Sequence, residues 1–180
     1  RHAIGIEAAP DAWLRDWAAL RPLASTRYAP LGGVADAPAL LLDAGTAAAR
    51  PYSHKELAQA AEPFLAAHPG YPQPGDLFWS AADWSGAAGL LEGLLPAWQL
   101  GQPVVAWGGG FAAAAAIELI AKYDVRNARL TAQELEAMMA AVPRPGEKHD
   151  CRLRTLAMGG TLPAPALAVW LERELGVRAA

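Results

Sequence analysis

A candidate anion-binding stretch begins at Asp43, directly after the apolar run of residues 39–42. A continuous apolar run of this kind is typical of a strand buried on both faces, and open α/β sheets usually bind ligands where such strands end. Gly45 would let backbone N–H groups approach an anion, and the Thr46 hydroxyl would add a donor. Asp43 contributes a negative charge, however, and no lysine follows until Lys55. By itself the stretch therefore does not predict a phosphate loop.

Residues 108–113, with the sequence GGGFAA, are a second candidate binding segment. They fit the pattern G-x-G-x-x-A between an expected strand and an expected helix, which is the fingerprint of dinucleotide binding. Asp124 follows sooner than the roughly twenty residues at which the ribose-binding acid usually lies, and it precedes the next strand instead of ending it. A tight glycine turn into an alanine-rich helix is the simpler interpretation. A Rossmann-like dinucleotide binder remains an alternative.

Three reactive residue types lie side by side at His149, Asp150 and Cys151. Neighbours on an extended chain point to opposite faces, so these side chains cannot form a nucleophile–base pair among themselves. We expect Cys151 to be a small core residue and His149 a solvated loop residue. The four histidines show no metal-ligand spacing, which argues against a zinc site.

The elements that would position these residues alternate between strand and helix. At the centre, an aromatic strand (77–79) leads into a mostly apolar helix (84–100) capped by Asp83, and a second strand follows at 102–107. Further helices are expected at 53–68, 111–123, 131–142 and 161–175, and further strands at 127–130 and 153–158. Pro63 should kink the first of these helices. The pattern predicts an α/β fold, a three-layer sandwich with a mostly parallel sheet flanked by helices.

We expect two parts along the chain. Residues 1–37 are predicted to form an N-terminal helix that begins at Pro10, followed by a linker, and residues 38–180 an α/β subdomain. The dispersed net charge of −3 argues against nucleic-acid binding. No apolar run is long enough to span a membrane, and no signal peptide is visible. Together with the single cysteine, Cys151, these features favour a cytoplasmic protein.

The order of several short segments is more specific than any one of them. Those segments are PALLL (38–42), GT (45–46), SHK (53–55), GDLFW (75–79), ADW (82–84), AGLL (88–91), PVVA (103–106), VRN (125–127) and GG (159–160). This order resembles the AMP-forming acyl-CoA synthetases, an adenylate-forming family, from about Pro38 onward. Medium-chain and acetyl-type members look most similar.

The resemblance implies the central part of the large N-terminal domain of such a synthetase. The family reaction uses ATP and magnesium to activate a carboxylate as an acyl-adenylate, and then transfers the acyl group to coenzyme A. By resemblance, Gly45 and Thr46 would be remnant phosphate contacts and Trp84 would line the acyl and nucleotide cleft. Gly159 and Gly160 would line the adenine pocket, where AMP is held. No catalytic residue and no metal ligand is carried over.

The departures from the family pattern are as informative as the matches. The phosphate loop lacks the second threonine, the later glycine and the lysine, and the family's Tyr-Gly-x-Thr-Glu segment and catalytic lysine would come after Ala180. We therefore expect a fragment or degenerate homologue that is inactive alone, so that the remaining parts of an adenylation domain or a partner protein would complete it. The number of tryptophans further suggests a homodimer. A non-catalytic interaction module, or pseudoenzyme, is the alternative.

Overall fold

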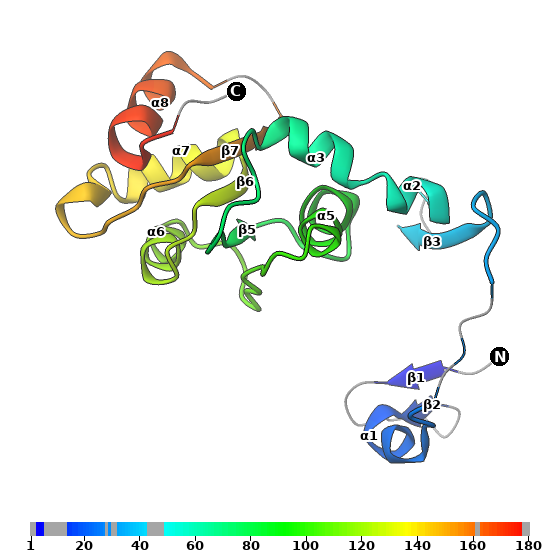
Figure 1. Cartoon of the computed structure of the whole chain (residues 1–180). Coiled ribbons are helices and arrows are strands. Elements are labelled where there is room, and N and C mark those ends of the chain that lie inside the picture. Colours follow the sequence, from blue (N-terminus) through cyan, green and yellow to red (C-terminus); the bar gives the residue numbers. More distant parts are fainter. Residues whose placement is uncertain are drawn as a thin grey trace. The chain divides into compact units, whose positions relative to one another are not determined.

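The computed structural model describes residues 3–5, 14–27, 29, 32–42, 49–160 and 163–177. The chain divides into two units, residues 1–33 and residues 34–180 (Figure 1). The second unit holds the sheet that was expected from the sequence, and it is the unit that carries the site described below.

The first unit contains a short strand pair where a helix was predicted. Strand β1 (Ala3–Gly5) pairs in parallel with β2 (Leu14–Asp16), and helix α1 (Trp17–Leu20) and a 3₁₀ turn, η1 (Arg21–Leu23), follow. The prediction of one helix from Pro10 is therefore wrong over Leu14–Asp16. A short isolated helix is only marginally stable in water. Pairing with β1 instead gives the backbone N–H and C=O groups of Leu14–Asp16 their hydrogen-bond partners. Pro10 itself lies outside the described residues.

The second unit opens with a hairpin. Strand β3 (Pro38–Leu42) pairs antiparallel with β4 (Arg50–Ser53), so that Leu40 lies opposite Tyr52. The expectation of a strand buried on both faces was wrong, because only Leu42 is buried and Leu41 is 54% exposed. The hairpin is separate from the parallel sheet, and helix α2 (His54–Ala58) packs against it.

A capping box starts α2, at the residue where the expected helix of residues 53–68 begins. The Glu56 N–H donates to Ser53 Oγ (3.2 Å), and the Ser53 N–H donates to Glu56 Oε2 (2.8 Å). The predicted kink at Pro63 is absent. Helix α2 instead ends before Gln59, and a new helix, α3 (Ala61–Ala67), places Pro63 in its first turn. Backbone N–H groups have no intrahelical partner there, so proline costs nothing at that position.

A parallel sheet forms the centre of this unit. It consists of β5 (Phe78–Ser80), β6 (Asn127–Thr131) and β7 (Thr155–Gly159) in that spatial order, and Val104 adds a single parallel bridge beside Phe78. From β5 the chain goes first to Val104 on one side and then to β6 on the other. The strand order therefore reverses beside β5, which is where open sheets of this kind leave a crevice for ligands.

Helices cover both faces of the sheet, which confirms the three-layer α/β prediction. Figure 1 shows α3 and α5 on one side and α6, α7 and α8 on the other. The helical segments after β5 run without a break from α4 (Ala87–Gly89) through a π-helical stretch, η2 (Leu90–Leu94), to α5 (Leu95–Gln99). The others are α6 (Ala113–Lys122), α7 (Ala132–Ala141), the 3₁₀ turn η3 (Pro145–Glu147), α8 (Pro165–Trp170) and the π-helical η4 (Leu171–Leu175).

Each face of the sheet has its own apolar core. Phe78 points to the first face, where it packs with Phe64, Tyr71 and Ala97. Trp79, the next residue, points to the other face and joins a larger core contributed by α6, α7, α8 and η4. That larger core contains Ile117, Ile120, Leu130, Leu135, Met138, Leu156, Leu167 and Leu171. The helices expected at 111–123, 131–142 and 161–175 thus supply most of this core.

Candidate functional site

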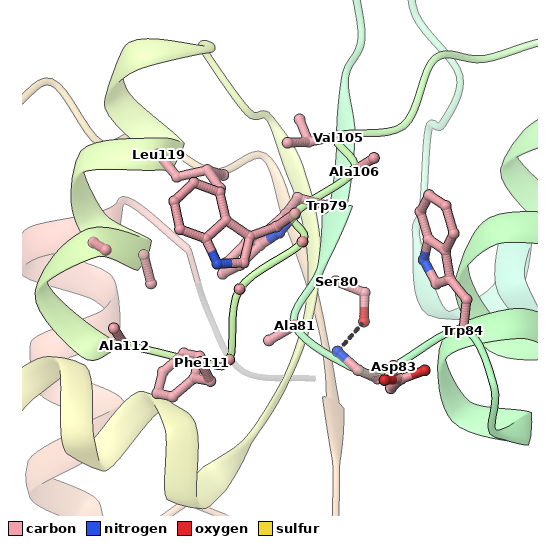
Figure 2. A pocket seen from close by; sticks show the side chains of 17 residues that line it. Trp79, Ser80, Ala81, Asp83, Trp84, Val105, Ala106, Phe111, Ala112 and Leu119 are labelled. Carbon is pink, nitrogen blue, oxygen red and sulfur yellow. Dashed lines mark hydrogen bonds between the residues drawn. The ribbon is translucent and has the colours of Figure 1, made fainter. Parts of the chain in front are cut away.

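A cavity of about 520 Å³ lies where β5 and the Val104 segment end, beside the point at which the strand order reverses. Its walls come from the end of β5 and the following loop, from the segment after Val104, and from the first turns of α6 (Figure 2). The lining residues are Trp79, Ser80, Ala81, Ala82, Asp83, Trp84, Val105, Ala106, Trp107, Gly108, Gly109, Gly110, Phe111, Ala112, Ala115, Ala116 and Leu119.

The cavity wall is apolar and aromatic. Three tryptophans and Phe111 line it together with small residues, and Asp83 is the only charged residue among the described lining residues. The Ser85 N–H donates to Asp83 Oδ1 (2.7 Å), and this hydrogen bond lowers the pKa of the Asp83 carboxyl, which therefore stays ionised. Since no lysine or arginine faces the cavity from these residues, it suits an apolar group far better than a polyphosphate.

A close backbone contact holds the loop that forms one wall. Gly89 of α4 lies so near this loop that a Cβ atom at position 89 would come within 2.5 Å of the Asp83 carbonyl carbon and 2.7 Å of the Ala82 carbonyl oxygen. The helix predicted to begin at Trp84 starts only at Ala87, with Gly86 at its N-cap position. The Asp83 side chain does not cap the helix. It accepts from the Ser85 N–H, two residues further on, and so closes a local turn.

Trp79 is a lining residue that the sequence did not single out. Only 2% of its surface is exposed, yet its Nε1–H has no hydrogen-bond partner among the described residues. Figure 2 shows Trp79 on the same side of β5 as Val105 and Leu119, with Trp84 on the other side. Alternation along the aromatic strand could have indicated the position of Trp79, since neighbouring residues such as Phe78 and Trp79 face opposite sides of a sheet.

Of the residues predicted by resemblance to contact ligands, Trp84 lies at the cavity and is half-buried. Gly159 and Gly160 do not line it. They end β7 on the far side of β6, where Gly159 packs against the Arg129 guanidinium and Gly160 has a positive φ of +99°. Their assignment to an adenine pocket stays a prediction. Gly45 and Thr46 lie outside the described residues.

The glycine segment of the dinucleotide alternative also lines the cavity. A Cβ atom on Gly108 or Gly110 would meet nothing within 4 Å, so packing does not require glycine at these two positions. Asp124 lies beyond the opposite end of the ten-residue helix α6, where it pairs with Arg126 (2.7 Å). The acid of the fingerprint is therefore far from the glycine turn that it would have to complement.

The prediction that Cys151 belongs to the core is confirmed. Its side chain is 2% exposed, and its thiol donates to the Ile117 carbonyl oxygen (3.3 Å). Burial raises the pKa of the Cys151 thiol to about 11, so the reactive thiolate is not populated near neutral pH. His149, expected to be solvated, is half-buried.

A buried polar cluster lies at the opposite end of the sheet, where β6 and β7 begin. Thr155 Oγ1 donates to Asn127 Oδ1 (2.7 Å), so the Nδ1–H of His68 must donate to Thr155 Oγ1 (2.6 Å). Burial, assisted by the positive charge of Arg129, lowers the pKa of His68 to about 4, and the imidazole is neutral. The role of His68 could not be predicted from the sequence, because its partner Thr155 is 87 residues away along the chain.

The described part of the chain contains neither a candidate metal site nor a candidate membrane span. No group of three or more His, Cys, Asp or Glu side chains there could hold a metal ion. Among the described helices, none is long and apolar enough to cross a bilayer.

Comparison with known proteins identifies the fold. No protein-family model and no curated protein matches this sequence significantly. Solved structures do match it. An acyl-CoA synthetase of Brucella canis superposes with a TM-score of 0.80 at 21% identity, over 96% of this chain and 32% of that one.

Two further structures place the chain in the same fold. The anthranilate CoA ligase AuaEII, solved with anthranoyl-AMP, matches with a TM-score of 0.76 at 17% identity over 99% of this chain and 35% of that one. MbtA of Mycobacterium smegmatis matches with a TM-score of 0.73 at 22% identity over 99% of this chain and 32% of that one. The chain thus spans about a third of the length of these proteins. The expected resemblance in fold to AMP-forming acyl-CoA synthetases is confirmed.

Proposed function

We propose that this chain is the acyl-binding central part of an adenylate-forming domain, or a degenerate relative of one, and that it does not catalyse adenylation by itself. The observation that carries the proposal is the apolar, aromatic cavity at the carboxyl ends of the parallel strands. Such a cavity suits the hydrocarbon part of an acid. A cytoplasmic location is part of the same proposal.

The family's phosphate chemistry fits the described residues poorly. Adenylation requires positive charge around the departing pyrophosphate, usually from magnesium and basic side chains. Asp83 is the only charged residue among the described lining residues, and one carboxylate does not make a magnesium site. We therefore assign no step of the reaction to ATP, magnesium or coenzyme A in this chain.

The first prediction is that the isolated chain neither binds ATP–Mg²⁺ tightly nor releases pyrophosphate. Isothermal titration with ATP–Mg²⁺ should show no binding below about millimolar concentration, because the cavity offers no cation to the phosphates. Pyrophosphate release should stay at background with octanoate, ATP–Mg²⁺ and coenzyme A. An intact medium-chain acyl-CoA synthetase is the positive control. Octanoate-dependent turnover at a rate typical of enzymes would contradict the proposal.

A second function, a non-catalytic interaction module, is favoured by surface features of the same unit. Strand β7 has a neighbour on one side only among the described strands. Trp98 and Val169, which lie outside the cavity, are 59% and 61% exposed. An open strand edge with apolar side chains on the surface is a recurrent site of association.

From these features we predict a homodimer, because pairing across a two-fold axis would cover two open edges at once. Light scattering across a hundredfold dilution should give twice the monomer mass of 18.9 kDa at the higher concentrations. A monomer mass throughout would show that these surfaces remain open in solution, and would leave the remaining parts of an adenylation domain or another protein as the partner.

A further inference from the structure

His68 is the C-cap residue of α3, and its side chain is buried against the sheet. The residue is 1% exposed, and α3 lies beside β7 (Figure 1). The rings of Phe64, Phe78 and Tyr71 surround the imidazole, with centroids 4.5, 5.4 and 6.2 Å from its own. Together with Ala97, these aromatic residues form the smaller apolar core. The histidine therefore belongs to the contact that holds α3 on the sheet.

A chain of hydrogen bonds fixes which nitrogen of this imidazole carries the proton. The Arg154 guanidinium can only donate, and it donates to Asn127 Oδ1 (3.3 Å), so the amide presents its oxygen to the network. The same oxygen accepts from Thr155 Oγ1 (2.7 Å), which in turn accepts from His68 Nδ1–H (2.6 Å). The lone pair of the imidazole is therefore on Nε2, which is buried and has no hydrogen-bond partner among the described residues. A second proton can be added only at Nε2.

Protonation of Nε2 is unfavourable while α3 is packed on the sheet, because it would bury a positive charge and an N–H group that lacks an acceptor. The charged and titratable groups of the neighbouring elements do not compensate. Arg129 of β6 is itself positive, and burial raises the pKa of the Tyr71 hydroxyl, which stays neutral. The carboxylates of Asp76 and Glu92 already form ion pairs, with Arg154 and Arg129 respectively. Burial, assisted by Arg129, therefore lowers the pKa of the histidine to about 4.

The same imidazole is free to accept a proton once α3 has left the sheet. A histidine exposed to water has a pKa of about 6.5, so the open state is protonated below that pH. Because the folded-state pKa is lower than this, the contribution of His68 to stability is complete above about pH 6.5 and is lost as the pH falls towards the folded-state value. Between pH 7.5 and pH 5.5 the ratio of open to closed molecules should rise about tenfold, since one pH unit below its pKa an exposed imidazole has a tenfold excess of the protonated form.

We propose that His68 is an acid-sensitive latch between α3 and the sheet, closed near neutral pH and released in mildly acidic solution by protonation at Nε2. Release of α3 opens the smaller core, whose aromatic residues surround the histidine. The larger core on the other face of the sheet contains none of these aromatic residues, so α6, α7 and α8 keep their packing. The latch lies at the opposite end of the sheet from the cavity, and its test is independent of the function proposed above.

NMR of the imidazole nitrogens tests the position of the proton in the full chain without any substitution. Of the four histidines, one should have a protonated Nδ1 and a bare Nε2, and its signals should not change between pH 7.5 and pH 5.5. Loss of these signals in His68→Asn assigns them. Titration of all four imidazoles with midpoints above pH 6 would overturn the latch.

Hydrogen exchange measures the release of α3 through the protection factors of its amides. In the parent, protection of α3 should fall about tenfold between pH 7.5 and pH 5.5, whereas protection of α7, in the larger core, should change less than about twofold. His68→Asn removes the titrating group and keeps an N–H at nearly the position of Nδ1 to donate to Thr155, so the fall in α3 should shrink to less than about twofold. His54→Asn, which changes an exposed histidine at the start of α2, is the matched control and should keep the tenfold fall.

Three results would contradict the latch. An equal fall in protection of α3 and α7 would show that acid acts on the whole unit and would reject a release confined to α3. A tenfold fall in α3 that persists in a folded His68→Asn protein would reject His68 as its source. Circular dichroism shows whether each variant is folded, and if His68→Asn is not, the parent alone is decisive, because unchanged protection of α3 between pH 7.5 and pH 5.5 would overturn the proposal.

Discussion

Replacing Gly89 by alanine is expected to destabilise the α/β unit by about 3 kcal/mol. A Cβ atom there would meet backbone, not a movable side chain, because the Asp83 carbonyl carbon lies 2.5 Å and the Ala82 carbonyl oxygen 2.7 Å from its position. The loop must then move away from α4. That loss exceeds the roughly 1 kcal/mol that alanine gains over glycine as a helix former.

Thermal unfolding followed by circular dichroism measures this effect, and a drop in Tm of roughly 10 °C is expected for a unit of this size. Gly93→Ala is the matched control in the same helical segment. Its added methyl group would make ordinary contact with Phe78 Cε1 at 3.5 Å, so its Tm should stay within about 3 °C of the parent. Similar Tm values for the two variants would show that the loop at Ala82 and Asp83 is not held against α4. Octanoate affinity should fall with Gly89→Ala, since the same loop forms a wall of the cavity.

The second large effect is expected from Asp76→Ala at the other end of the sheet. Asp76 is 2% exposed, forms an ion pair with Arg154, and accepts from the Gln73 N–H (2.7 Å). Removing the carboxylate leaves the partly buried Arg154 without its counter-charge. Breaking a buried pair in this way costs about 3 kcal/mol, and urea unfolding at pH 7 should show a loss of that size.

Asp150→Ala is the control for this variant. Asp150 pairs with Arg152 (3.0 Å), but both side chains are more than three-quarters exposed, so its removal should cost no more than about 0.5 kcal/mol. Equal losses in the free energy of unfolding for Asp76→Ala and Asp150→Ala would show that burial does not strengthen the Asp76–Arg154 pair.

The pH dependence of the Asp76 effect follows from its pKa. Burial acts to raise the pKa of the Asp76 carboxyl, but hydrogen bonds from Arg154 and the Gln73 N–H outweigh burial and lower it. Because the folded-state pKa lies below the unfolded value of about 4, the pair contributes fully above that pH. Its contribution is lost as the pH falls through the folded-state pKa. The difference between parent and Asp76→Ala should therefore be constant from pH 7 to pH 5 and should shrink below about pH 4. A difference that already shrinks between pH 7 and pH 5 would rule Asp76 out as its source.

Local sequence determined where helices begin and end, because those points depend on interactions between residues that are close along the chain. The capping boxes at Ser53 and Thr131 start helices as expected, since both partners of each box lie within three residues of one another. The left-handed Gly176 (φ +70°) ends the last helical segment for a similar reason. Alternation of strands and helices was sufficient for the α/β class, because buried apolar faces on both elements leave few ways to pack.

Tertiary structure decided the features that depend on distant segments. Leu14–Asp16 became a strand because β1 is available to pair with it, and the run at residues 39–42 became a hairpin strand because β4, not the parallel sheet, pairs with it. The cavity is a further example. Trp79 and the start of α6 are over thirty residues apart, and only the packing of α6 on β5 and β6 brings the Trp79 side chain and the helix end to one wall. The spacing of residues along the chain does not predict such contacts. They follow from the order of the strands in the sheet, which depends on how the buried faces of the elements pack together.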